Sequence, residues 1–314
     1  MLSEFIENIN RRLGFRGIFR FDEPMARHTT FKVGGPADLW IRPGGEEFPE
    51  YAALLLKEAR REKIPVFILG GGANVVIADR GIRGIVLDTG GFGGAGKGGV
   101  SPEGAFLTFN AGTSADEAAE TAAAAGLSGL EFLAGMPGSV GGALWMNARC
   151  YERSVSDGLV EAEYLDGDTG RREKLPARQE DFGYKMSPFQ GKNQLILGAR
   201  FALRNRPERE IRAEMEDHRR DREAKGHYRF PCAGSVFKNN RLFGAPTGQI
   251  IDKLGLRGFA LGDAQVAPWH GNIIINRGRA GAGDIRNLAE LLKARVREEL
   301  ALELESEILF AGDW

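Results

Sequence analysis

The sequence has almost no cysteine and no excess of charge of either sign. Cys150 and Cys232 are the only cysteines in 314 residues, which is far from a disulfide framework and lacks the paired spacing of a zinc site. Lysine and arginine together number 42 and aspartate and glutamate 43, so the total charge does not indicate a nucleic acid or an anionic membrane as the partner. We therefore expect a small-molecule partner and a reducing compartment.

Long apolar runs are missing as well. The first thirty residues mix charges throughout, unlike a signal peptide, and no later run approaches the roughly 20 apolar residues that span a bilayer. No internal repeat is evident. These absences predict a cytoplasmic protein with no membrane, nucleic-acid or metal partner, and we expect it to be a monomer.

What the sequence does contain is a pattern of alternating strands and helices. Strands are predicted at 37–43 and 64–70 on either side of a helical segment, and shorter strands follow from about residue 159. The segment 208–226 carries charge on nearly every face and suits an exposed connecting helix. The length favours two lobes. We predict an α+β fold with a first lobe of residues 1–205, its core at about 29–205, and a second lobe of residues 206–314.

The second lobe continues the alternation and ends in LELESEILFAG. An alternating last strand would project Glu303, Glu305 and Glu307 to one side, and spacing alone favours a solvated edge. In the long helix before it, apolar residues recur at steps of three or four, which places them in the core. These residues are Ile285, Leu288, Leu292, Val296 and Leu300.

Glycine marks three stretches of the first lobe. In the run at 90–99, Gly94, Gly96 and Gly99 satisfy the spacing G-x-G-x-x-G, and Lys97 nearly completes a P-loop. A dinucleotide fingerprint must open a helix, whereas the residues that follow this run have strand character. We therefore interpret the run as a surface loop.

The other two glycine stretches are better candidates for a phosphate site. ILGGGANVV at 68–76 follows an apolar strand directly, and EFLAGMPGSVGGALWMNA at 131–148 places four glycines around Pro137 and Ser139. Such glycines expose backbone N–H groups to a phosphate, although either stretch alone would equally suit close packing of elements. Two such stretches in one lobe favour a dinucleotide diphosphate held by both loops.

Several polar residues are candidates for chemistry, each with a structural alternative. Ser235 in PCAGSVFKNN is a candidate proton donor, but a serine in a small-residue turn is more often structural. His270 in PWHGNIIIN is a candidate base, although a histidine at a strand entrance is usually only hydrogen-bonded. Lys185 in FGYKMSPFQ has apolar and aromatic neighbours that indicate partial burial, and Cys232 reads as a small buried neighbour of Ser235.

Taken together, these stretches resemble the UDP-N-acetylenolpyruvoylglucosamine reductases, the MurB family. The matching stretches follow the family order and cover nearly the whole chain. They are HTTFKVGGPADLW, IPVFILGGGANVVIADRGIRGIVL, GLSGLEFLAGMPGSVGGALWMNA, FGYKMSPFQ, AGSVFKNN, GDAQVAPWHGNIIIN and LELESEI. The absence of an inserted tyrosine-bearing loop between FGYKMSPFQ and AGSVFKNN resembles the shorter subtype of the family.

The resemblance implies a two-lobed flavoprotein. Its first lobe would hold FAD in the vanillyl-alcohol-oxidase-like (PCMH-type) manner, and its smaller α/β lobe would bind UDP-GlcNAc-enolpyruvate. NADPH, as co-substrate, would reduce the flavin. The enolpyruvyl group would then take a hydride from the flavin and a proton from the protein, which gives UDP-N-acetylmuramate for peptidoglycan synthesis.

The family's functional residues fall on matching positions of this chain. The resemblance implies that Ser235 donates the proton and that Glu307, on a last strand returning to the active site, stabilises the enolate with Lys185. It assigns substrate contacts to Tyr184, Lys225 and Asn239. The implied FAD contacts are Gly70, Gly71, Gly72, Asn74, Gly135, Pro137, Gly138, Ser139, Gly141, Gly142 and Asn147.

The chain departs from the family pattern at a few positions. Lys185 stands where most members have arginine, and lysine lacks the planar fork that binds a carboxylate through two hydrogen bonds. MNARCYE replaces a glycine-rich continuation, and Leu309 stands where an arginine is common. Two other functions stay open, another FAD-dependent oxidase or dehydrogenase of the superfamily and a non-catalytic nucleotide-sugar binding protein.

Overall fold

The computed structural model describes residues 2–14, 17–95, 98–101 and 104–314, and the chain forms two compact units. The units are made of alternating chain segments. The first unit comprises Met1–Phe21, Leu39–Gly71 and Gly84–Arg220, and the second comprises Asp22–Asp38, Gly72–Arg83 and Asp221–Trp314. The lobe boundary near 206 stays a prediction. The last boundary between the two units follows Arg220, and segments of the N-terminal half of the chain belong to both units.

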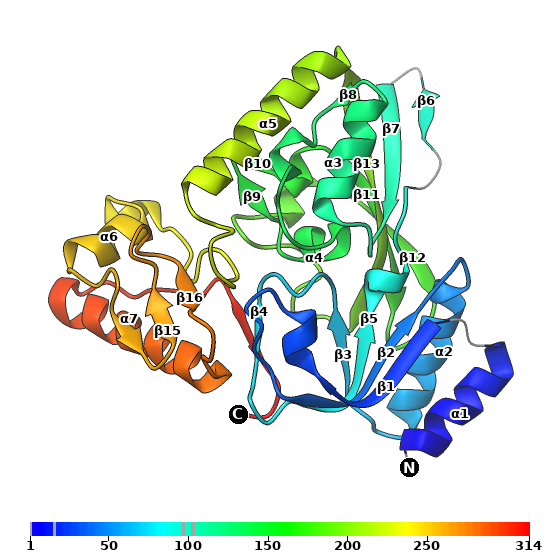
Figure 1. Cartoon of the computed structure of the whole chain (residues 1–314). Coiled ribbons are helices and arrows are strands. Elements are labelled where there is room, and N and C mark those ends of the chain that lie inside the picture. Colours follow the sequence, from blue (N-terminus) through cyan, green and yellow to red (C-terminus); the bar gives the residue numbers. More distant parts are fainter. Residues whose placement is uncertain (1, 15–16, 96–97, 102–103) are drawn as a thin grey trace. The chain divides into compact units, whose positions relative to one another are not determined.

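The first unit begins with a four-stranded sheet whose helices fill one apolar cluster with it (Figure 1). Leu39 and Ile85 on the strands pack with Phe48 and Leu55 on the second helix, and all four are fully buried. The strand order is β1 (Gly17–Pro24), β2 (Pro36–Pro43), β5 (Ile82–Asp88) and β3 (Val66–Leu69), and the helices are α1 (Leu2–Leu13) and α2 (Phe48–Arg61). The predicted strand–helix–strand segment is thus confirmed.

The second sheet of this unit has β13 at its centre. Its strand order is β12 (Arg172–Pro176), β11 (Leu159–Asp166), β13 (Gln194–Asn205), β7 (Gly104–Asn110) and β6 (Gly99–Ser101), with β8 (Leu127–Ser128) also on β13. A separate short hairpin pairs β9 (Arg149–Cys150) with β10 (Arg153–Ser154). Because β6 and β7 directly follow the 90–99 run, the expected strand character after it is confirmed; Gly96 and Lys97 lie outside the described residues.

Three helices cover one face of this sheet (Figure 1). They are α3 (Ala115–Ala124), α4 (Val140–Trp145) and α5 (Glu208–Ala224). The Ser114 hydroxyl accepts the Glu117 N–H and so caps the start of α3. Helix α5 is less exposed than its charge predicts, because Ile211 and Met215 are fully buried in the core.

The second unit has its own core around α7. It contains α6 (Thr247–Lys253), α7 (Ala282–Leu300), the sheet β14 (Ala260–Leu261), β15 (Ala264–Val266) and β16 (Ile274–Asn276), and the parallel pair β4 (Val75–Ile77) and β17 (Leu309–Ala311). Four of the five predicted core residues of α7 are buried. Leu300 is 43 % exposed, so its predicted burial is wrong. It is the last helical residue, and Ala301 turns the chain into the left-handed region.

Short 3-10 helices connect the larger elements. They are η1 (Met25–His28), η2 (Thr89–Gly91), η3 (Glu131–Leu133), η4 (Val155–Asp157), η5 (Gln179–Asp181) and η6 (Arg241–Phe243). Across the described ranges, no helix is both long and apolar enough to cross a bilayer. Cys150 and Cys232 are both free thiols.

Leu288 should be a principal contributor to the stability of the second unit, because it is fully buried in the α7 core. We expect Leu288→Ala to lower the free energy of unfolding by about 3 kcal/mol, through lost apolar burial and the cavity left behind. Urea denaturation measures this change. The matched control is Glu298→Ala on the same helix, where the side chain is exposed and the change should stay within about 0.5 kcal/mol. Equal effects of the two substitutions would contradict the assignment.

Candidate functional site

The two predicted glycine loops contact each other within the first unit. A Cβ added to Gly71 would lie 2.5 Å from the Cα of Gly138, and one added to Gly70 would lie 2.7 Å from the Oγ of Ser139. Both distances are too short for real side chains, so Gly71 meets the backbone of Gly138 and Gly70 meets the Ser139 side chain at points where only glycine fits. At Gly71 and Gly138 the two loops therefore meet through backbone atoms, the groups that a diphosphate cradle uses.

Other glycines of these loops serve the backbone path. Gly135 and Gly138 have φ values of +70° and +118°, and exposed Pro137 lies between them. Gly72 has a φ of +62°, and its added Cβ would lie 1.9 Å from the carbonyl oxygen of His28. That contact belongs to the second unit. At these positions a side chain would be strained or would clash with the backbone.

The second loop is also tied firmly to its own unit. The N–H of Gly141 donates to the carbonyl of Ala111 at 2.9 Å, and an added Cβ would lie 2.8 Å from the Ala111 Cβ. The Ser139 hydroxyl accepts the N–H of Gly142 at 3.3 Å and so caps α4. These three residues thus fix where α4 begins. Their predicted contacts with FAD stay predictions.

Tyr184 and Lys185 occupy a tight turn in the first unit. Gly183 and Met186 close the turn with two backbone hydrogen bonds of 3.0 and 3.1 Å, and Lys185 takes a φ of +57°. The Tyr184 side chain is exposed, and Lys185 is half-buried, as its neighbours in the sequence indicated. Because a non-glycine residue at positive φ needs support, the contacts that hold this turn matter for the site.

Asn147 and Gln190 supply that support. Asn147 Nδ2 donates to the carbonyl of Gly183 at 2.8 Å, while its Oδ1 accepts the N–H of Ser156 at 3.1 Å. Gln190 Nε2 donates to the carbonyls of Lys185 at 3.2 Å and Trp145 at 3.0 Å. The buried Asn147 side chain therefore ties the turn to the backbone at Ser156. Its predicted contact with FAD stays a prediction.

The structure brings the segments of Ser235 and Glu307 together in the second unit. The N–H of Glu307 donates to the carbonyl of Val236 at 2.7 Å. Asn74 Nδ2 donates to the Glu307 carbonyl at 3.0 Å, and the Asn74 carbonyl accepts the N–H of Leu309 at 3.0 Å. Three predicted site residues, Ser235, Asn74 and Glu307, thus lie on hydrogen-bonded neighbouring segments.

The last segment is less regular than an alternating strand. Strand β17 begins only at Leu309, after an isolated bridge between Ser306 and Phe237. Glu303 and Glu305 are exposed, whereas Glu307 is half-buried. The predicted solvated edge therefore holds for the first two carboxylates. Glu307 differs because the Val236 and Asn74 contacts draw its backbone inward.

The remaining predicted residues also lie in the second unit. Beside them, Lys238 Nζ pairs with Glu305 Oε1 at 2.5 Å. Asn239 Oδ1 accepts the N–H of Thr247 at 2.9 Å, at the start of α6. Lys225 Nζ pairs with Asp221 Oδ2 at 2.6 Å, and its side chain is half-exposed.

Two histidines near Lys225 are neutral at physiological pH. Burial and the charge of Arg222 lower the pKa of His227 to about 4, and burial with the charge of Arg257 also lowers the pKa of His270. His270 Nδ1 accepts the N–H of Asn272 at 3.1 Å, which fits the structural reading of this histidine. Cys232 is buried, as expected for a small neighbour of Ser235. Burial raises the pKa of its thiol, which disfavours the thiolate that a nucleophile needs.

Comparison with known proteins gives the same family over the whole chain. Residues 226–311 match the family model of the UDP-N-acetylenolpyruvoylglucosamine reductase C-terminal domain, and residues 49–175 match that of an FAD binding domain. The UDP-N-acetylenolpyruvoylglucosamine reductase of Treponema denticola is 40 % identical over 97 % of both chains. That of Treponema pallidum is 38 % identical over 96 % of both. The chain belongs to this family.

A solved member has the same fold. The crystal structure of the reductase MurB from Thermus caldophilus matches 94 % of this chain and 99 % of its own, with a TM-score of 0.74 and 32 % identity. The predicted α+β flavoprotein fold is thus confirmed, and this MurB-family chain is an FAD-dependent oxidoreductase. The glycine loops fit the diphosphate of FAD, because Gly71 and Gly138 meet through backbone atoms and backbone N–H groups bind phosphate oxygens.

Sequence reasoning missed residues that hydrogen-bond to the backbone of the predicted site residues. Gln190 anchors Lys185, and Asp116 accepts the N–H of Gly135 at 2.7 Å. Neither has a local signal, since Asp116 reads as an ordinary acidic residue in the first turn of a helix. A glutamine five residues after Lys185 has no distinctive spacing either. Both act through contacts that only the folded chain provides.

Gly71 should be indispensable for FAD binding, because its added Cβ would meet the backbone of Gly138. We expect Gly71→Ala to push the loops apart and to weaken FAD binding by about 10- to 100-fold, as overpacking by one methyl group costs about 1–3 kcal/mol. Titration of flavin-free protein with FAD measures this loss. The control is Gly99→Ala, where an added Cβ meets nothing within 4 Å. A normal affinity in Gly71→Ala would show that FAD does not rest on this contact.

Proposed function

We propose that this protein reduces UDP-N-acetylglucosamine enolpyruvate to UDP-N-acetylmuramate for peptidoglycan synthesis, with NADPH as the electron donor. The observation that supports this best is the hydrogen-bonded pairing of the Ser235–Val236 segment with Glu307. Protonation of an enolate needs a proton donor and a group that stabilises negative charge. These are the roles that the family resemblance gives to Ser235 and Glu307.

FAD, when bound, accepts a hydride from NADPH and passes it to the enolpyruvyl group. The backbone at Gly70, Gly71 and Gly138 would hold its diphosphate, since N–H groups at a glycine turn bind phosphate oxygens without competition from side chains. Because these loops are already in contact, binding of FAD would cost little free energy for ordering them. In this role the glycines form a preorganised binding site for the cofactor's diphosphate.

Ser235 would protonate the enolate carbon, and Glu307 and Lys185 would stabilise the enolate oxygen. Gly234 has a φ of +70°, so the chain turns sharply just before Ser235, and the half-buried serine follows two small residues. Lys185 would act as a single positive charge, because an ammonium group has no fork to align. The supported turn at Gly183–Met186 fixes the backbone from which it reaches.

Lys225, Asn239 and Tyr184 would bind the substrate. Lys225, the residue after α5, forms an ion pair with Asp221 four residues before it, and both side chains are partly exposed, so exchanging this pair for contact with a diphosphate costs little. Asn239 is held against Thr247, which fixes its backbone for a nucleotide contact. Exposed Tyr184 offers an aromatic face. A monomeric, cytoplasmic enzyme completes the proposal.

An anaerobic two-step titration tests the proposed reaction. NADPH should bleach the absorbance of bound FAD, and the enolpyruvyl UDP-sugar should restore it without oxygen. Restoration by oxygen or another acceptor, with no response to the UDP-sugar, would favour a different flavin oxidase or dehydrogenase. A protein that binds the UDP-sugar but is not bleached by NADPH would instead be a non-catalytic binding protein.

Ser235→Ala should separate the two half-reactions. Flavin reduction by NADPH should stay nearly normal, while reoxidation by the substrate should slow by about 10²- to 10⁴-fold, because only that step needs the proton donor. Stopped-flow absorbance measures both rates. The matched control is Ser306→Ala, beside Glu307, whose buried hydroxyl has no hydrogen-bond partner among the described residues. Equal slowing of both half-reactions in Ser235→Ala would refute the assignment.

A further inference from the structure

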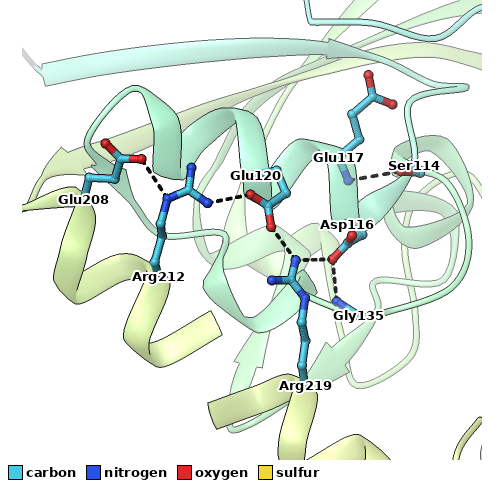
Figure 2. Close-up of polar contacts among 8 residues, drawn as sticks. All are labelled: Ser114, Asp116, Glu117, Glu120, Gly135, Glu208, Arg212 and Arg219. Atoms are coloured by element: carbon cyan, nitrogen blue, oxygen red, sulfur yellow. Dashed lines mark hydrogen bonds and ion pairs between the residues drawn. The ribbon is translucent and has the colours of Figure 1, made fainter. Parts of the chain in front are cut away.

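A polar network runs from helix α5 through α3 to the start of the second glycine loop (Figure 2). Arg219 Nη2 on α5 donates to Asp116 Oδ1 at 2.8 Å and to Glu120 Oε1 at 2.5 Å. The same Asp116 oxygen accepts the N–H of Gly135 at 2.7 Å. A single carboxylate oxygen thus joins the arginine of one helix to the first residue of the loop.

The network has a second arginine that does not reach the loop. Arg212, two turns earlier on α5, donates to Glu120 Oε2 at 2.8 Å and to Glu208 Oε1 at 2.7 Å. Figure 2 shows Glu120 between the two arginines, with only Arg219 continuing to Asp116. Both arginines therefore join α5 to α3, but only one of them is coupled to Gly135.

The Asp116 contact differs in kind from the other attachments of the loop. The Gly138 carbonyl accepts the N–H of Ala115 at 3.0 Å, and the N–H of Val140 donates to the Thr113 carbonyl at 2.8 Å. These bonds are made by backbone and tie down the far end of the loop. At the near end, Gly135 takes a φ of +70°, and Asp116 holds its N–H by a side chain.

Asp116 is ionised at neutral pH, which strengthens its hold on the loop. Burial raises the pKa of its carboxyl group, but the Gly135 N–H and Arg219 lower it by more, so the net shift is downward. A hydrogen bond to an ionised acceptor is about twice as strong as a neutral one. Arg219 also keeps the carboxylate oriented, since it binds the oxygen that accepts from Gly135.

We propose that Asp116 and Arg219 are positioning residues of the flavin site, which hold the Gly135–Ser139 loop in the conformation that binds FAD. Neither residue needs to touch the cofactor. The contact with Gly138 leaves no room for a side chain at Gly71, and Asp116 holds the N–H of Gly135 at the start of the same loop as Gly138. This inference rests on the proposed contact of the loop with FAD.

Titration of flavin-free variants with FAD, followed by flavin fluorescence, tests the inference. Asp116→Ala should raise the dissociation constant at least about tenfold, as expected for loss of a hydrogen bond to a charged group. Asp116→Asn should recover part of this loss, because its amide oxygen still accepts the Gly135 N–H. Arg219→Gln should weaken binding by about three- to fivefold, since the carboxylate keeps the Gly135 bond but loses its orientation.

Arg212→Gln is the matched control, because it removes an α5–α3 ion pair of the same kind without touching Asp116. Its affinity for FAD should stay within about twofold of the parent protein. Hydrogen–deuterium exchange of the peptide that contains Gly135 gives a readout in the absence of FAD. Exchange should speed up in Arg219→Gln and not in Arg212→Gln. If Asp116→Ala fails to fold, this pair of variants still tests the positioning role.

The outcomes separate this inference from the assignment of the loop itself. Weak FAD binding in Gly71→Ala but normal binding in Asp116→Ala and Arg219→Gln would overturn the positioning role and leave the flavin loop in place. Equal losses in Arg219→Gln and Arg212→Gln would overturn it too, since they would reflect only the joining of two helices. Normal binding in Gly71→Ala would overturn both.

Discussion

The backbone contact between Gly70–Gly71 and Gly138–Ser139 is the constraint on which the first unit depends. Its two sides come from distant parts of the chain, one after β3 and the other before α4. A Cβ at Gly71 would lie 2.5 Å from the Cα of Gly138, so the contact leaves no room for a side chain at Gly71. The four-stranded sheet and the α3–α4 region must therefore be placed correctly relative to each other before the loops can form a cofactor site.

A similar constraint organises the second unit. Residues 72–83 and 22–38 belong to it because they pack on the C-terminal part: β4 pairs with β17, and Gly72 lies against the His28 carbonyl. Asn74 then reaches the Glu307 carbonyl. The chain thus passes from one unit to the other directly after Gly71, within the first glycine loop.

The sequence predicts local structure well here, because local structure depends on neighbouring residues. The strands around α2 and four buried residues of α7 follow from the spacing of apolar residues. Leu300 has the same spacing but lies where the helix ends, and spacing carries no information about that end. The many charged residues of α5 predict an exposed helix and obscure its two core residues, Ile211 and Met215. Arginines of α5 also make ion pairs with α3, which no pattern within α5 indicates.

The site residues that the family resemblance implies stay predictions, whereas the residues that support them had no signal in the sequence. Family resemblance names Lys185, while only the fold shows that Gln190 and Asn147 hold the turn around it at a positive φ. This support bears on the exchange of arginine for lysine. A guanidinium fork must be aligned in two directions, whereas an ammonium group needs only to reach the right point. A backbone fixed on both sides of Lys185 determines where its side chain starts, which is the condition a point charge requires. In the proposed reaction, this turn would fix the point from which the Lys185 ammonium group reaches the substrate.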